Sequence, residues 1–317
     1  MAVVIIGDMH YMSEKDNAIK HKQTKLFMNW LSNNHEVNQS TNTAIFLGDI
    51  AEYNIDYRTI QTLLDWLQKL KFQKIYIIQG NHDCIVGDTL LSVLETIPKV
   101  EIIKEPQIKT IEEQTYLCLP HYEGDMYKRY NNLHTEKQFE QEFDWGVGHI
   151  ADENNAFGGS KFIDLSNLKV TKWLLGHIHS NSERYLGSVI KNSSTEKNDS
   201  KYIAVIDNKE YELIKVPNFL DYITCNWGEY PEVTAPLNLF QINNCSTSKA
   251  ECELEYKSKY GVDIGFTRIL STRQTMLEQT TNNNSNACYS IDNLFNQFAQ
   301  EKKLNQQIID ICKKVIL

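Results

Sequence analysis

The sequence predicts an α/β fold from three apolar runs that each stop at a glycine and from the polar side chains that follow them. These β-branched runs occupy residues 2–6, 43–47 and 74–79, directly before Gly7, Gly48 and Gly80, and the pattern is typical of a buried strand that ends in a turn. In α/β folds, the residues just beyond the strand ends line the ligand crevice. We therefore expect four polar side chains to converge: Asp8, His10, Asp49 and Asn81.

Five short motifs follow one another in the first 180 residues: GDMH, GD, GNHD, GH and GHIH. A Gly-Asp or Gly-His pair alone is more often a simple turn, but GNHD in order between GD and GHIH indicates a site. Seven donors are enough for two adjacent cations if one carboxylate bridges them. The motifs supply seven such side chains: Asp8, His10, Asp49, Asn81, His149, His177 and His179.

The donor set combines carboxylate, imidazole and amide groups and contains no thiolate. This mixture favours manganese or a similar divalent ion, magnesium included, over a structural zinc, which prefers cysteines. Two such ions side by side activate water and hold the oxygens of a phosphate during in-line displacement. The motifs therefore predict hydrolysis of phosphoesters.

These motifs resemble those of the calcineurin-like metallophosphoesterase superfamily. The resemblance implies a four-layer sandwich of two mixed β-sheets flanked by helices. It assigns one metal to Asp8, His10, Asp49 and His179, and the other to Asp49, Asn81, His149 and His177. Asp49 is then the bridging ligand.

The histidine of GNHD has a separate role in this resemblance. His82 is expected to face the phosphate, where it stabilises charge or protonates the leaving oxygen, and the alternative is a structural histidine. Asp83 is expected to orient the His82 ring and hold its tautomer. His121 lies near the site edge in this family and could touch substrate, whereas His21 and His35 are expected in solvent.

Two segments distinguish branches of the superfamily. Protein serine/threonine phosphatases carry an arginine shortly after the second aspartate, but this chain reads GDIAEYN there. Residues 183–218 resemble SbcD-type DNA repair nucleases, and most of all the phage-type nuclease subunit of a recombination endonuclease. That likeness implies a DNA exonuclease or endonuclease that works with an SbcC-like coiled-coil ATPase. Glu52 stands where cellular SbcD-type enzymes have a histidine, which leaves the exonucleolytic step open.

The chain divides into four predicted parts. Residues 1–218 form the nuclease domain, and 219–271, with strands at 222–227, 237–242 and 262–271 and a helix at 248–260, resemble a small α/β capping domain. The polar segment 272–287 reads as a flexible linker. Residues 288–317 are predicted to form a helix-loop-helix that binds the ATPase, or alternatively one that folds back on the capping domain. Its apolar residues recur at helical spacing: Ile291, Leu294, Phe295 and Phe298.

The overall charge argues against a nuclease. The formal net charge is −9, whereas DNA attracts basic surfaces. Two divalent ions would add four positive charges, and two local basic clusters exist, one at Lys20, Lys22 and Lys25 and one at Lys128 and Arg129. No apolar run approaches 18 residues and no signal peptide opens the chain, so a cytoplasmic location without membrane contact is expected. The seven cysteines lack a CxxC pattern and are expected to be reduced.

Other interpretations remain. The chain could be a stand-alone metallophosphatase or phosphodiesterase acting on small phosphoesters, or a non-catalytic adaptor that keeps the fold. A homodimer through helices in 54–70 and 88–97 is also open. The leucines that would form its face could equally be core residues: Leu63, Leu67, Leu90 and Leu94.

Overall fold

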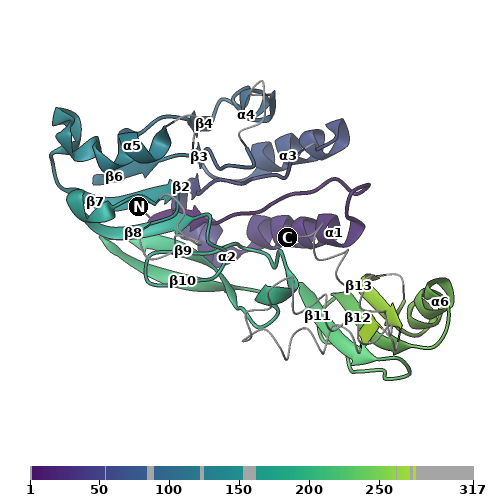
Figure 1. The fold of residues 1–317 in the computed structure, drawn as a ribbon. Helices are drawn as coiled ribbons and strands as arrows, with labels where there is room; N and C mark the ends of the chain where they lie inside the picture. The colour runs from purple at the N-terminus through teal and green to yellow at the C-terminus, as the bar shows by residue number, and fades with distance from the viewer. Residues whose placement is uncertain are drawn as a thin grey trace, which may run out of the picture.

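The computed structural model describes residues 2–53, 55–83, 89–121, 125–152, 162–261, 263–271 and 274–275. They contain a six-stranded sheet in the order β10-β9-β1-β2-β3-β4 (Figure 1). Its strands β1 to β4 are parallel, while β9 is antiparallel to both β1 and β10. The strand bounds are β1 Ala2–Ile6, β2 Thr41–Phe46, β3 Lys74–Ile78, β4 Val100–Ile103, β9 Lys201–Asp207 and β10 Glu210–Val216.

A four-stranded sheet has the order β5-β6-β7-β8. The pair β5–β6 is antiparallel and the other pairs are parallel, so both large sheets are mixed. Its bounds are β5 Gln107–Ile111, β6 Gln114–Leu119, β7 Phe143–His149 and β8 Val170–Gly176. The helices of this part are α1 Ala18–Asn33, α2 His35–Ser40, α3 Tyr57–Lys69, α4 Thr89–Leu94 and α5 Met126–Asn131, with short 3-10 turns at Leu133–Thr135, Lys137–Phe139, Leu165–Asn167 and Ser194–Glu196.

Strand alternation explains the layers. On β1, Val3 and Ile5 point toward the four-stranded sheet and pack in one cluster with Trp145 of β7. Their neighbours Val4 and Ile6 point the other way and pack against α1 and α3. Helix α5 and the first three 3-10 turns cover the outer face of the four-stranded sheet. The result is helix, sheet, sheet, helix, which confirms the predicted α/β sandwich of two mixed sheets.

The helices proposed for dimerisation belong to this core. Leu63 and Leu67 of α3 and Leu94 of α4 have no exposed surface and pack on the six-stranded sheet. The core alternative is therefore correct for these three leucines. These leucines therefore do not form an exposed dimer face.

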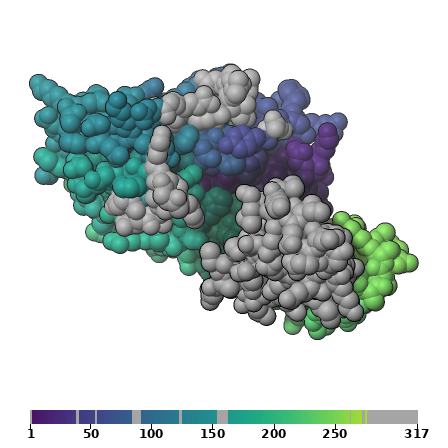
Figure 2. Space-filling view, viewed as in Figure 1, coloured from purple at the N-terminus to yellow at the C-terminus, as the bar shows by residue number. Residues whose placement is uncertain are grey.

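A third sheet follows the sandwich. Strands β11 (Leu220–Asn226), β12 (Leu237–Cys245) and β13 (Ile264–Ser271) are parallel and carry helix α6 (Lys249–Tyr260). Ser248 and Glu251 form a capping box that fixes the start of α6. The unit joins the sandwich through Ile19 of α1, which packs against β11 and β12. Figures 1 and 2 show it at the opposite end of the molecule from β5 to β8.

This unit lies within the range 219–271 predicted for a capping domain. Most of the predicted linker and the whole helix-loop-helix of 288–317 lie outside the described residues. Among the described helices, none has the length and apolar character needed to cross a membrane.

Candidate metal centre

The seven predicted donors lie at one edge of the sandwich, at the carboxyl ends of strands from both large sheets. Asp8, Asp49 and Asn81 follow the parallel strands β1, β2 and β3 of the six-stranded sheet. His10 lies two residues after Asp8, in the same loop beyond β1. The other three donors come from the four-stranded sheet, where His149 ends β7 and His177 and His179 follow β8. The convergence expected from the glycine-terminated strands is therefore observed.

One group of donors forms around Asp8. Candidate ligand atoms of Asp8, His10 and His179 all lie within 4.8 Å of one another. The Nε2 atoms of His10 and His179 are 3.0 Å apart, and His179 Nε2 is 3.9 Å from Asp8 Oδ2. Both rings thus present the same nitrogen to a common point.

A second group forms around Asn81. The Oδ1 atom of Asn81 lies 2.9 Å from His149 Nε2 and 2.9 Å from His177 Nδ1. Asp49 stands between the two groups, because its Oδ2 atom is 3.2 Å from His149 Nε2 and 3.6 Å from His10 Nε2. One carboxylate oxygen facing both groups is the arrangement that a bridging ligand requires.

The residues present fit divalent ions. Asp8 Oδ1 is buried and has no hydrogen-bond partner in the part of the chain that the structure describes, and burial raises the pKa of this carboxyl. A buried carboxylate oxygen without a donor is costly unless a cation satisfies it. Burial and the neighbouring His149 lower the pKa of His177 to about 3, so this ring is neutral, as a ligand must be.

The comparison with known families agrees with this geometry. The sequence pattern of the family described as calcineurin-like phosphoesterase matches residues 1–181, which include all seven donors. The chain belongs to this family. Its members are metal-dependent hydrolases of phosphoesters, and the described residues contain candidate ligand clusters for divalent ions.

No curated protein matches the chain. Among solved structures, this phosphoesterase is similar to a protein of unknown function from Aquifex aeolicus. The two share 13% sequence identity with a TM-score of 0.34, over 53% of this chain and 87% of that one.

The glycines of the motifs make room for the donors of neighbouring strands. A Cβ atom on Gly80 would lie 2.2 Å from Asp49 Oδ1, and one on Gly176 would lie 2.5 Å from Asp8 Oδ1. Both distances are too short for atoms that are not bonded. The glycine at these two strand ends is therefore required by close approach.

Replacement of Gly80 by alanine should displace Asp49 and weaken metal binding, while the sandwich still folds at a cost of about 1–3 kcal/mol of overpacking. Manganese titration by calorimetry measures the first effect and thermal unfolding the second. Gly265→Ala in β13 is the control, because its Cβ would crowd Leu239 in the third sheet and should leave metal affinity unchanged. Equal affinities in both variants would contradict the role given to Gly80.

The backbone at the site is strained. His10 and Asp49 both have φ near 46°, and His177 has φ of 82°. Residues other than glycine rarely adopt this left-handed region, at a cost on the order of 1–3 kcal/mol each. The residue types at these positions do not indicate a left-handed backbone, so the sequence did not predict this strain.

Buried partners orient the histidine rings of the phosphoesterase site. His149 Nδ1 lies 2.9 Å from the Leu47 carbonyl oxygen, which leaves Nε2 facing Asp49. His179 Nδ1 lies 3.1 Å from Glu196 Oε1, and Lys201 Nζ is 2.6 Å from Glu196 Oε2. Burial opposes ionisation of Glu196, but His179 and Lys201 outweigh it and lower its pKa to about 2. Carboxylates of this kind fix the tautomer of metal-binding histidines.

Glu196 was missed at the level of sequence. It lies 17 residues beyond His179, in a polar stretch without a recognisable motif. Only the fold reveals its contact with the ring.

The partner of His82 also differs from the expectation. The Asp83 carboxylate accepts hydrogen bonds from the backbone N–H groups of Ile50 (3.1 Å) and Gly80 (2.9 Å). It therefore ties two loops together and does not orient His82. Glu52 takes that place, with Oε2 at 2.7 Å from His82 Nδ1 and Oε1 at 2.8 Å from His10 Nδ1. One carboxylate thus contacts a candidate ligand and the candidate acid together.

Glu52→Gln should lower the turnover of a phosphodiester substrate and weaken manganese binding, each by about 10–100-fold, the usual effect of removing a carboxylate behind a metal-site histidine. Steady-state kinetics and metal titration provide the two measurements. Glu140→Gln, at an exposed position, should change neither. Full activity in Glu52→Gln would show that the ring orientation is set by packing alone.

The other histidines are placed as follows. His21, expected in solvent, is buried because its ring stacks on Tyr11 and its Nδ1 lies 2.9 Å from the Met12 carbonyl oxygen. His35 is exposed as expected. The backbone N–H of His121 donates to the Gln79 carbonyl oxygen at 2.8 Å, two residues before Asn81. Burial, together with His149, lowers the pKa of His121 to about 4, so its ring is uncharged.

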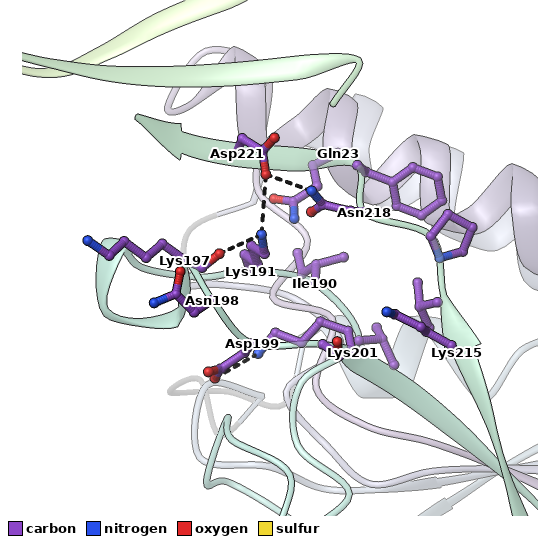
Figure 3. Close-up of a pocket in the computed structure, with 15 residues that line it drawn as sticks. Gln23, Ile190, Lys191, Lys197, Asn198, Asp199, Lys201, Lys215, Asn218 and Asp221 are labelled. Carbon is purple, nitrogen blue, oxygen red and sulfur yellow. Dashed lines mark hydrogen bonds and ion pairs between the residues drawn. The ribbon is translucent and has the colours of Figure 1, made fainter. Parts of the chain in front are cut away.

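The predicted basic clusters are partly neutralised. Lys22 Nζ lies 2.5 Å from Asp263, and Arg129 is 2.5 Å from Glu105. A cavity of about 250 Å³ between the six-stranded sheet and β11 is also rich in lysine. There Lys191 is held by Asp221 at 3.5 Å and by a backbone carbonyl (Figure 3). These three cations therefore each have an acidic partner within the chain.

Proposed function

We propose that this phosphoesterase is a two-metal phosphodiesterase that acts on DNA. It would serve as the nuclease subunit beside an SbcC-like ATPase in DNA end processing, recombination or repair. The observation that carries the two-metal part is the position of Asp49 Oδ2 between the two donor groups, 3.6 Å from His10 and 3.2 Å from His149. Manganese is the proposed ion, with magnesium as the alternative. Oxygen and imidazole donors suit these two ions better than they suit metals that prefer thiolate ligands.

The chain's own residues divide the work. Asp8, His10, Asp49 and His179 would hold one ion, and Asp49, Asn81, His149 and His177 the other. When bound, the ions activate water and neutralise charge on the phosphate.

His82 would supply the proton for the leaving oxygen. Burial lowers the pKa of His82, but the Glu52 and Asp49 carboxylates outweigh burial and raise it overall. This raised pKa favours the protonated ring, which is the form that a general acid needs.

Two features support DNA as the substrate. Residues 183–218 resemble the corresponding segment of SbcD-type nucleases, and a small α/β unit follows the phosphoesterase domain, as in those enzymes. The pairing of Lys22 and Arg129 with acidic residues argues that the chain alone binds DNA weakly. The ATPase would then provide most contacts to the DNA backbone.

The test is a cleavage assay on duplex and single-stranded DNA with manganese, magnesium and a chelator, with and without a candidate coiled-coil ATPase. Manganese-dependent cleavage that the ATPase stimulates is the expected result. Hydrolysis of small phosphoesters without any DNA cleavage would favour the stand-alone phosphoesterase. Tight metal binding without hydrolysis of either substrate would favour the adaptor.

Truncation after Ser271 should separate chemistry from assembly. Residues 272–317 include the proposed ATPase-binding helices, whose apolar stripe would supply the anchor side chains of an interface. The truncated protein is expected to bind manganese and hydrolyse a small activated phosphodiester, but not to co-purify with its ATPase. Phe295→Asp in the full chain is the gentler version. Aggregation or metal loss on truncation would assign the helices to the core instead.

A further inference from the structure

One aromatic side chain beside the site has no role in metal binding or proton transfer. Tyr53 follows Glu52 in the loop between β2 and α3, and 47% of its surface is exposed. Its ring stacks on His82, with centroids 4.3 Å apart and planes inclined by 28°. An exposed ring in direct contact with the candidate general acid stands where a substrate must arrive.

The Tyr53 ring extends a row of rings that begins among the metal donors. His10 and His82 meet edge to face, with centroids 4.8 Å apart, and Tyr53 covers the next face of His82. The Tyr53 hydroxyl donates to the backbone carbonyl oxygen of Asn81 at 3.3 Å, and this bond anchors the far end of the ring. The three rings therefore lead from the metal centre to solvent, and the last one, Tyr53, is exposed and fixed in position.

A phosphate at the donor groups would place its ester substituents within a few ångströms of His82. The exposed ring of Tyr53 offers a flat substituent there a surface on which to stack. Nucleobases stack on tyrosine with little regard to sequence.

We propose that Tyr53 is a stacking platform for the nucleobase next to the scissile phosphate, so that the site selects nucleotide phosphoesters over phosphoesters without a base. This inference deepens the proposed function by naming its substrate class, and it rests on that function only for the identity of the polymer. The same contact would hold His82 between Tyr53 and His10 when the base is in place.

Calorimetric titration of the manganese-loaded full chain tests the proposal without relying on turnover. The two ligands are deoxyadenosine 5′-monophosphate and 2-deoxyribose 5-phosphate, which share the sugar and phosphate and differ only in the base. The wild-type protein should bind the nucleotide about tenfold more tightly, an effect within the range of a single base–aromatic stack. Tyr53→Leu should bring the two dissociation constants together, and Tyr53→Trp should keep them apart.

Tyr57→Leu is the matched control. Tyr57 is 76% exposed at the start of α3, and its hydroxyl bonds to Gln61 instead of the site. This variant should keep the wild-type ratio of dissociation constants.

Equal constants in the wild type, no measurable nucleotide binding, or an unchanged ratio in Tyr53→Leu would each overturn the proposal. A fall in affinity for both ligands alike would show that Tyr53 only supports His82, which also overturns it. DNA cleavage measured on the same preparation reports separately on the proposed function. Cleavage with equal constants refutes the platform alone, and unequal constants without cleavage refute the DNA substrate alone.

Discussion

Asp49→Ala is expected to empty or scramble both metal sites and to abolish hydrolysis. The Asp49 carboxylate faces both donor groups through one oxygen. Its other oxygen accepts a hydrogen bond from the backbone N–H of His82 at 2.8 Å. Loss of a residue that only supports a metal ligand typically lowers affinity by about 10–100-fold. Removal of Asp49 should lower manganese affinity by more than that. Metal analysis after gel filtration and calorimetric titration measure the effect.

Stability should follow the metal in this variant. Ions that bind only the folded chain raise its melting temperature, so manganese should stabilise the wild type and fail to stabilise Asp49→Ala. Asp65→Ala, at an exposed position on α3, should behave as the wild type does. A variant at position 49 that retained two ions and its manganese-dependent stabilisation would show that Asp49 is not the bridge.

His82→Ala should give the opposite combination, with both ions retained and hydrolysis reduced by about 10²–10⁴-fold, the usual contribution of a general acid. In the wild-type chain, Nε2 of His82 is 4.0 Å from Asp49 Oδ2 and Nδ1 contacts Glu52. The ring therefore lies beside the donor groups. Metal content and turnover of an activated phosphodiester are the two measurements.

A leaving-group series makes this test sharper. A general acid matters most for poor leaving groups, so the loss in His82→Ala should shrink for nitrophenyl esters and grow for alkyl esters. His134→Ala, at a partly buried position near Leu133, should have no such dependence. Fewer ions in His82→Ala would make His82 a ligand and not an acid.

The sequence predicted the strands, and the polar side chains that meet beyond them, because both depend on local patterns. Strands predicted at 2–6, 43–47 and 74–79 are observed with ends displaced by at most two residues. At Gly48 and Gly80 a Cβ would strike a candidate donor, His149 or Asp49, and at Gly7 it would strike the Gly187 carbonyl oxygen. The motif and the close approach are two descriptions of one constraint.

The partners behind the donors could not be predicted in the same way. Asp83 is adjacent to His82 in sequence, yet its side chain binds backbone N–H groups of Ile50 and Gly80. Glu52 lies 30 residues earlier and reaches the ring only because β2 and β3 are neighbours in the sheet. His21 was expected in solvent because its neighbours are polar, but its ring faces the core side of α1. Such contacts depend on tertiary packing, which spacing along the chain does not encode.

The donors come from both large sheets, and this has a consequence for how the domain assembles. His10 and His179 meet at 3.0 Å although 169 residues separate them. An ion held by both would act as a cross-link that closes most of the domain into one loop, and long loops are the ones whose closure restricts the unfolded chain most. A nascent chain could complete this cross-link only after β8 had been synthesised. Chelation should therefore speed hydrogen exchange at the seam between the two sheets before it affects the helices on their outer faces.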